Sequence, residues 1–183
     1  LCAVTGTQHG LYFGGDVEAT ASVAVTNAVV TQTGAAATGA VRFSGAVAGP
    51  VTFMGGTITS ATSAAHFSQL VTSAVAFRGV TSTAALHNFV RFDQGLGASS
   101  ALTVTGGSHT SFSHGIEVHT VFDATAVITV DGAATVTSQD QRAVSMRAPS
   151  AAGTMAFTGC TLASKAEAIL VSDDLVGPLV VTD

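Results

Sequence analysis

Apolar and polar residues alternate in short blocks along the chain, and one block returns about every 26 residues. It consists of an apolar residue, any residue, a second apolar residue and one further residue, followed by glycine, asparagine or aspartate. Seven copies end at residues 27, 55, 79, 106, 132, 159 and 183. Because the steps vary between 24 and 28 residues, the repeat predicts a solenoid of stacked coils whose loops differ in length.

A second apolar-x-apolar triplet precedes each block, at residues 11–13, 41–43, 65–67, 90–92, 116–118, 144–146 and 169–171. Side chains alternate between the two faces of a strand, so the outer members of each triplet should point inward and the middle member outward. The middle positions are Tyr12, Arg42, His66, Arg91 and Glu117, followed by Ser145 and Leu170. We expect this row to face solvent, because a slip of one residue would bury its charges.

A third short strand follows each glycine or asparagine, where the chain is expected to turn with positive φ. Its outward positions are rich in threonine, and the members of this row are Thr31, Thr59, Thr83, Thr110 and Thr137. Stacking also places Phe13, Phe43, Phe67 and Phe92 above one another in the core. The pattern therefore predicts an all-β parallel β-helix of about seven coils with three short strands per coil.

Composition excludes several functional classes. Charged residues make up 9% of the 183 residues and the net charge is −5, so a nucleic-acid partner is not expected. No apolar run approaches the roughly 18–20 residues of a membrane-spanning helix, so membrane insertion is not expected. Neither the two cysteines nor the six histidines have the spacing of a metal site, and we expect no metal or cofactor. His109 is expected to lie inside the coils, near Ser82.

The repeat runs without a linker, which predicts a single β-helix domain over residues 1–183. The chain begins at Leu1 and shows no signal peptide, so we expect a mature chain or a segment of a longer precursor. Few lysines and glutamates and many threonines, serines and alanines are typical of extracellular or cell- or virion-surface solenoids.

In coil length, three-strand layout and turn chemistry, the whole chain resembles the pectin-lyase-like right-handed parallel β-helices. That superfamily includes polysaccharide lyases and hydrolases, phage tailspikes and surface adhesins, so the resemblance implies a right-handed β-helix. The hydrolases carry an Asn-Thr-Asp phrase, which this chain lacks, and an Asp-Asp pair near Gly-His-Gly. Here Asp173-Asp174 fall in a terminal loop and Ser113-His114-Gly115 lacks the first glycine. We therefore do not expect an enzyme; a polysaccharide lyase or hydrolase is the enzymatic alternative.

The row of Tyr12, Arg42, His66, Arg91 and Glu117 is the candidate glycan-binding face. Together with Asp93 and His119 it could form a shallow groove, in which the aromatic ring stacks on a sugar and Glu117 acts as acid or base. The alternative is a solvated face with a cross-strand ion pair between Arg91 and Glu117. The row itself has no second carboxylate, so we favour the solvated face.

The threonine row has a separate interpretation. Paired Thr-x-Thr rows on a flat face are similar to those of ice-binding solenoids, although Ala3, Val29, Ser108 and Ala163 interrupt the pairing. Exposed strand positions favour threonine in any case. Ice binding is therefore the third functional hypothesis.

Cys2 and Cys160 occupy equivalent positions of the repeat six coils apart, about 29 Å at the usual strand spacing, so they cannot form a disulfide within one chain. If chains stack head to tail, Cys2 of one chain would lie near Cys160 and Asp183 of the next, at a candidate junction. The alternative is that both cysteines are small buried hydrophobic residues. Either the segment belongs to a longer β-helix or identical chains continue one another.

These observations favour a structural role, as a building block of an extracellular or surface filament, fibre or adhesin stalk that self-associates head to tail or laterally. Carbohydrate recognition or cleavage is the second hypothesis, with a glycan as the partner.

Overall fold

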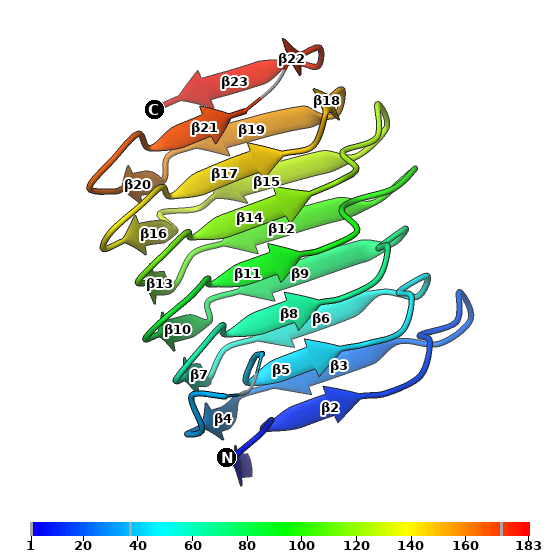
Figure 1. The fold of residues 1–183 in the computed structure, drawn as a ribbon, viewed down its shortest axis with the longest axis vertical. Helices are drawn as coiled ribbons and strands as arrows, with labels where there is room; N and C mark the ends of the chain where they lie inside the picture. The colour runs from blue at the N-terminus through cyan, green and yellow to red at the C-terminus, as the bar shows by residue number, and fades with distance from the viewer. Residues whose placement is uncertain (1, 37, 173) are drawn as a thin grey trace.

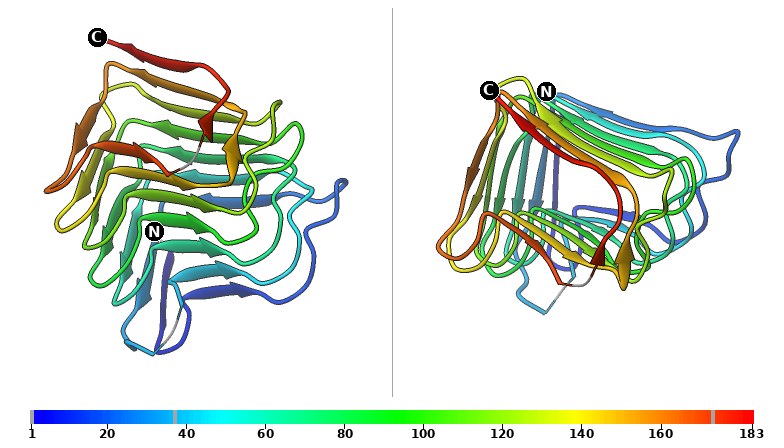
Figure 2. Two further views of the ribbon diagram at one scale, coloured as in Figure 1. Left: turned by 45° about the horizontal axis from the view of Figure 1, so that its top comes forward. Right: turned by 90° about the horizontal axis from the view of Figure 1, so that it is seen from above.

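The computed structural model describes residues 2–36, 38–172 and 174–183, and every element in these ranges is a β-strand. Leu1 and Asp173 lie outside the described residues. The strands wind into a right-handed coil that climbs steadily from the N-terminus to the C-terminus (Figure 1). Seen along its axis, each coil lies above the previous one (Figure 2). The predicted all-β parallel β-helix is confirmed.

Three parallel sheets of seven strands each form the walls. Sheet A consists of β1 (Cys2–Gly6), β4 (Ala28–Gln32), β7 (Thr57–Ser60), β10 (Thr81–Ala84), β13 (Ser108–Ser111), β16 (Thr135–Ser138) and β20 (Thr161–Ala163). Sheet B consists of β2 (Leu11–Phe13), β5 (Val41–Phe43), β8 (Ala65–Phe67), β11 (Val90–Phe92), β14 (Ile116–His119), β17 (Val144–Arg147) and β21 (Ile169–Val171). Sheet C consists of β3 (Val23–Thr26), β6 (Val51–Met54), β9 (Ala74–Arg78), β12 (Ala101–Thr105), β15 (Val127–Asp131), β19 (Thr154–Thr158) and β23 (Leu179–Thr182).

Each coil runs from sheet B to sheet C and then to sheet A. The turn between sheets C and A is very short, and its residue has φ of 48° at Asn27 and 61° at Gly55. The equivalent Gly79, Gly106, Gly132 and Gly159 also have φ between 55° and 61°. Glycine adopts this left-handed conformation without steric cost and asparagine tolerates it, which explains why the repeat ends on these residues.

A fourth inward column, which the sequence pattern did not reveal, lies between sheets B and C. Isolated parallel bridges connect, in order, Val17, Val47, Val71, Leu96, Phe122 and Ala151. Two short strands, β18 (Ser150–Ala151) and β22 (Asp174–Leu175), continue this side. Single bridged residues are too short for alternation, so they left no periodic signal.

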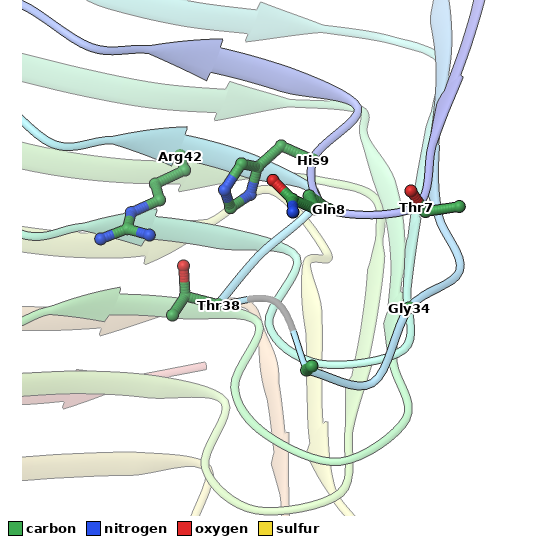
Figure 3. A pocket seen from close by; sticks show the side chains of 7 residues that line it. Thr7, Gln8, His9, Gly34, Thr38 and Arg42 are labelled. Carbon is green, nitrogen blue, oxygen red and sulfur yellow. The ribbon is translucent and has the colours of Figure 1, made fainter.

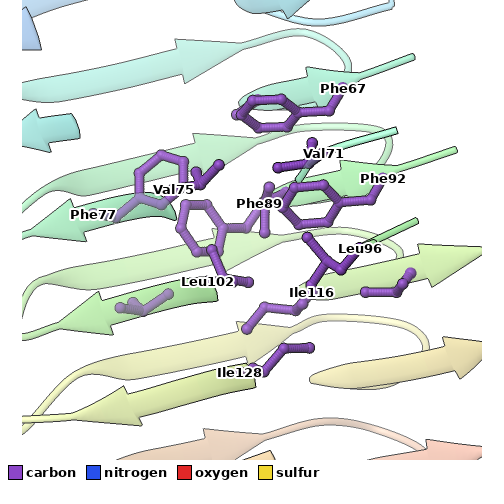
Figure 4. Packing of buried hydrophobic residues seen from close by; sticks show 14 of the residues in the cluster. Phe67, Val71, Val75, Phe77, Phe89, Phe92, Leu96, Leu102, Ile116 and Ile128 are labelled. Carbon is purple, nitrogen blue, oxygen red and sulfur yellow. The ribbon is translucent and has the colours of Figure 1, made fainter. Parts of the chain in front are cut away.

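Phenylalanine rings stack along the axis inside sheet B. The centroids of Phe43 and Phe67 lie 4.8 Å apart with nearly parallel planes, and those of Phe67 and Phe92 lie 4.9 Å apart. Phe13 continues the column below, and all but this terminal ring are fully buried. Figure 4 shows how Phe67 and Phe92 pack with the aliphatic side chains of neighbouring coils. The predicted core column is confirmed.

His109 lies in the core, as expected. Its Nδ1 is 3.0 Å from Ser82 Oγ, and its ring stacks on Phe89 at a centroid distance of 3.8 Å. Burial lowers the pKa of His109 to about 4, against an opposing hydrogen bond with the Gly106 backbone. The imidazole is therefore neutral at pH 7.

Candidate functional site

The predicted row of charged and aromatic residues forms one column on the outward side of sheet B. The strand register pairs Tyr12, Arg42, His66, Arg91 and Glu117 in this order. Tyr12 is 57% exposed, but His66 and Glu117 are only 6% and 3% exposed. The expectation that the row faces solvent is therefore wrong for His66 and Glu117. Polar side chains from adjacent coils fold over these two residues and cover them.

Glu117 is the centre of a buried polar cluster. Asn88 Nδ2 donates a 2.6 Å hydrogen bond to Glu117 Oε2. The side-chain oxygen of Asn88, Oδ1, accepts a hydrogen bond from the His114 backbone N–H. The other carboxylate oxygen, Oε1, lies 3.1 Å from His119 Nε2 and 3.3 Å from Arg147 Nε. His114 Nδ1 lies 3.5 Å from the same oxygen. The buried carboxylate is thus surrounded by donors on several sides.

These contacts keep Glu117 ionised. Burial by itself would raise its pKa, but the neighbouring His114 and His119 and the Arg91 guanidinium outweigh it, so the pKa of Glu117 lies below its usual value. Burial lowers the pKa of His114, although Glu117 acts in the opposite direction. A glutamate with a lowered pKa is a poor general acid at neutral pH.

Asp93 is the second carboxylate of this face, one column away from the predicted row. It accepts a 2.6 Å hydrogen bond from Arg91 Nε and a 2.7 Å hydrogen bond from His66 Nε2. Burial opposes ionisation, yet these two donors hold the pKa of Asp93 below its usual value. The predicted ion pair between Arg91 and Glu117 is present at 3.8 Å, so Arg91 bridges the two carboxylates.

Sequence reasoning named Asp93 and His119 as members of the groove but missed Asn88, His114 and Arg147 as partners of Glu117. Asn88 and His114 lie two residues before strands β11 and β14, and Arg147 is the last residue of β17. His119 ends β14 and pairs in register with Arg147. For Arg147 this register is the available signal, because residues two positions beyond the outward row occupy a second outward column. Asn88 and His114 lie three positions before the row, where strand alternation gives no signal.

Two shallow pockets lie beside this face, over the corner between sheets A and B. The first has a volume of about 390 Å³, and its lining residues are Thr7, Gln8, His9, Gly34, Ala36, Thr38 and Arg42 (Figure 3). The second has a volume of about 280 Å³, and its lining residues are Thr38, Ser63, His66, His87, Arg91 and Asp93. Thr38 lines both pockets, which makes them neighbours along the axis.

The threonine row forms a continuous column on the outward side of sheet A. The register stacks, in order, Thr5, Thr31, Thr59, Thr83, Thr110, Thr137 and Ala163. A second column holds Ala3, Val29, Thr57, Thr81, Ser108, Thr135 and Thr161. The hydroxyl column extends one coil further than expected, to Thr5, and the ice-binding interpretation stays a prediction.

The two cysteines belong to one column of sheet A, at its two ends. Cys2 is exposed, Cys160 is half-buried against the core, and both are free thiols. A third pocket, of about 270 Å³, is lined by Cys160, Leu162 and Asp183 together with apolar residues of the last coil. The predicted junction of Cys2 with Cys160 and Asp183 stays a prediction.

Among the described residues, no three histidines, cysteines or acidic residues are arranged to hold a metal ion. In the same ranges, no helix has the length and apolar character needed to cross a membrane.

No family model, no curated protein and no solved structure matches the chain. The chain is therefore classified by its architecture alone, a right-handed parallel β-solenoid of about seven coils.

Proposed function

We propose that this chain is a structural β-solenoid building block of an extracellular or surface filament, fibre or adhesin stalk. The observation that carries the proposal is the uninterrupted stacking of three parallel sheets, in register, over seven coils. Every coil is joined to the next by backbone hydrogen bonds on three sides, so bending the rod would break many of them together. The aromatic and aliphatic columns inside add continuous packing along the axis.

We further propose that the chain is related to the surface-fibre and tailspike members of the pectin-lyase-like superfamily. Coil length, three sheets and a positive-φ turn between the second and third strands support this relationship. Fold alone does not determine function, so the relationship adds no catalytic role.

The proposal includes head-to-tail association. Strand β23 at one end is exposed, with Val180 at 44% and Val181 at 66%, and the pocket beside Asp183 opens onto the apolar interior. Exposed strand edges of this kind pair readily with another strand. A second chain whose β1 stacked on β20 would bring its Cys2 into the column of Cys160.

Electron microscopy of the purified chain tests this role. Filaments with an axial repeat of about 34 Å, seven coils at the usual strand spacing, are expected for head-to-tail stacking. A dimer band on non-reducing gels that is lost in Cys2→Ser would place the thiols at the junction. Monodisperse, unassociated particles at all concentrations would contradict the self-association, and a chain digested rapidly by proteases would contradict a stiff rod.

A second candidate function is carbohydrate recognition by the outward side of sheet B. The two adjacent pockets over the corner between sheets A and B support it, because together they form a continuous polar hollow beside the outward row. Both carboxylates there are engaged in ion pairs and have lowered pKa values, which favours binding over cleavage. A glycan array measures binding, and a reducing-end release assay on the bound glycans measures cleavage. Release of new reducing ends would overturn the non-catalytic proposal.

A further inference from the structure

The arginines on the outward side of sheet B, and Arg142 in the connection before β17, differ in whether a carboxylate neutralises them. Arg91 is bonded to Asp93, Arg147 lies 3.3 Å from Glu117, and Arg142 Nε donates to Glu167. Arg42 is the exception. Among the described residues no carboxylate lies within ion-pairing distance of its guanidinium, and its Nε is buried without a hydrogen-bond partner.

Arg42 lines the larger of the two adjacent pockets, and none of the described residues that line it is acidic. Figure 3 shows the side chains of Arg42, His9 and Thr38 next to one another at this pocket. His9 Nδ1 donates a 2.9 Å hydrogen bond to the Gly39 carbonyl oxygen, so Nε2 of the neutral ring is an acceptor for a sugar hydroxyl and the anion is left to Arg42. The His9 ring also stacks on Tyr12 at 5.1 Å, which holds it in place.

The charge of this pocket contrasts with that of the whole chain. The protein has a net charge of −5, yet the pocket brings together one unneutralised arginine, one histidine and uncharged hydroxyl and amide groups. A partly buried guanidinium without a counter-ion is costly, and a bound anion would remove that cost through charge-assisted hydrogen bonds. The volume of the Arg42 pocket, about 390 Å³, also falls within the range of small-molecule sites.

The neighbouring pocket has a different character. Its arginine, Arg91, is neutralised by Asp93, which also bonds His66. This second pocket therefore offers neutral polar contacts to whatever extends past Thr38, the residue common to both.

We propose that the pocket of Arg42 and His9 binds the carboxylate or sulfate group of an acidic glycan, and that the adjoining pocket of His66 and Arg91 accepts the next, uncharged part of the same sugar chain. This inference rests on the second candidate function and names its ligand class. Arg42 supplies the charge, since its planar fork matches both anions. The carboxylate and the sulfate share this chemistry, and the experiment separates them.

Calorimetric titration of the intact chain tests the proposal with three ligands of equal length: a uronic-acid hexamer, a sulfated hexasaccharide and a neutral hexasaccharide. We expect at least one of the two acidic ligands to bind, and the neutral one to bind at least tenfold more weakly. Arg42→Gln should weaken the acidic ligand about 10- to 100-fold, the loss of one charged hydrogen-bonding partner, while Arg42→Lys should retain part of the affinity.

Arg78→Gln is the matched control. Arg78 is an arginine at the end of β9 on sheet C, is exposed, and lines neither pocket. It should leave the affinity unchanged. Circular dichroism melting of both variants shows that they remain folded, and raising the salt concentration should weaken binding of the acidic ligand only.

Each outcome decides between the two levels of the proposal. Equal affinity for acidic and neutral sugars, with no effect of Arg42→Gln, would overturn the anion site and leave carbohydrate recognition standing. Equal weakening by Arg42→Gln and Arg78→Gln would reduce the effect to net charge and also overturn it. Failure of all three ligands to bind would overturn the anion site, and an empty glycan array would then remove carbohydrate recognition as well.

Discussion

Sheets A and B have the same backbone architecture but differ in their outward side chains, which are mostly threonine on sheet A and include many charged residues on sheet B. Both contain seven parallel strands in continuous register. The strands of sheet A hold no aspartate, glutamate, lysine or arginine, and their outward columns are mostly threonine. The outward side of sheet B carries charged residues, and their side chains contact one another closely enough to bury Glu117. The pairing of the strands therefore does not depend on which side chains occupy the outward columns. The side chains of the inward columns determine the fold.

The strongest test of this comparison removes an inward ring. Phe67 is fully buried between Phe43 and Phe92, so Phe67→Ala should lower the free energy of unfolding by about 3–5 kcal/mol. Thr83→Ala on the outer side of sheet A is the control and should change it by less than about 0.5 kcal/mol. Denaturant titration measures both. Similar losses for the two variants would show that outward positions matter as much as inward ones.

The second test uses the inward histidine of sheet A. The pKa of folded His109 is about 4, below the usual value near 6.5, so between these values the unfolded chain binds the extra proton and acid favours unfolding. The stabilising effect is complete above about pH 6.5 and is lost as the pH falls toward 4, with a magnitude of about 3 kcal/mol. The double variant Ser82→Ala/His109→Leu should lose less stability over this range.

Denaturant midpoints from pH 7 to pH 4 measure this difference, with the exposed His87→Asn as the control. His66 and His114 also have lowered pKa values, but they are present in all the proteins compared. Parallel curves for the unmodified chain and the double variant would contradict the assignment to His109.

The third test asks whether the charged cluster of sheet B stabilises the fold. Glu117→Gln leaves the surrounding histidines and Arg147 without their shared carboxylate and should cost about 2–3 kcal/mol at pH 7. This is less than for a fully buried pair, because Arg147 reaches solvent. Glu18→Gln, an exposed glutamate outside the sheets, is the control and should be close to neutral. If Glu117→Gln left the free energy of unfolding unchanged, the charged cluster would not contribute to the stability of the fold.

The smallest effect is expected on the threonine columns. Thr59→Lys/Thr83→Lys adds two charges to sheet A and should change the free energy of unfolding by less than about 0.5 kcal/mol per site. An ice-recrystallisation assay on the unmodified chain and on this variant decides the ice-binding hypothesis. Only a face that binds ice would show activity that the lysines abolish, and an inactive unmodified chain would reject the hypothesis.

The 26-residue repeat determined the stacking of coils, the register of each strand and the positive-φ turns. These features are local, since alternation within three to five residues decides which side chains point inward and a glycine or asparagine decides where the chain turns. The Phe67 column and the threonine column of Thr59 and Thr83 were therefore predictable from sequence spacing.

Only the tertiary structure decided how the outward side chains of sheet B meet. Glu117 and Asn88 are 29 residues apart, and whether their side chains bond depends on rotamers and loop paths that no periodicity encodes. The same holds for Arg42, whose buried Nε has no hydrogen-bond partner among the described residues, as only the placement of its neighbours from other coils reveals. Sequence spacing determines which strand a residue occupies, whereas burial and pairing of long polar side chains depend on contacts between coils.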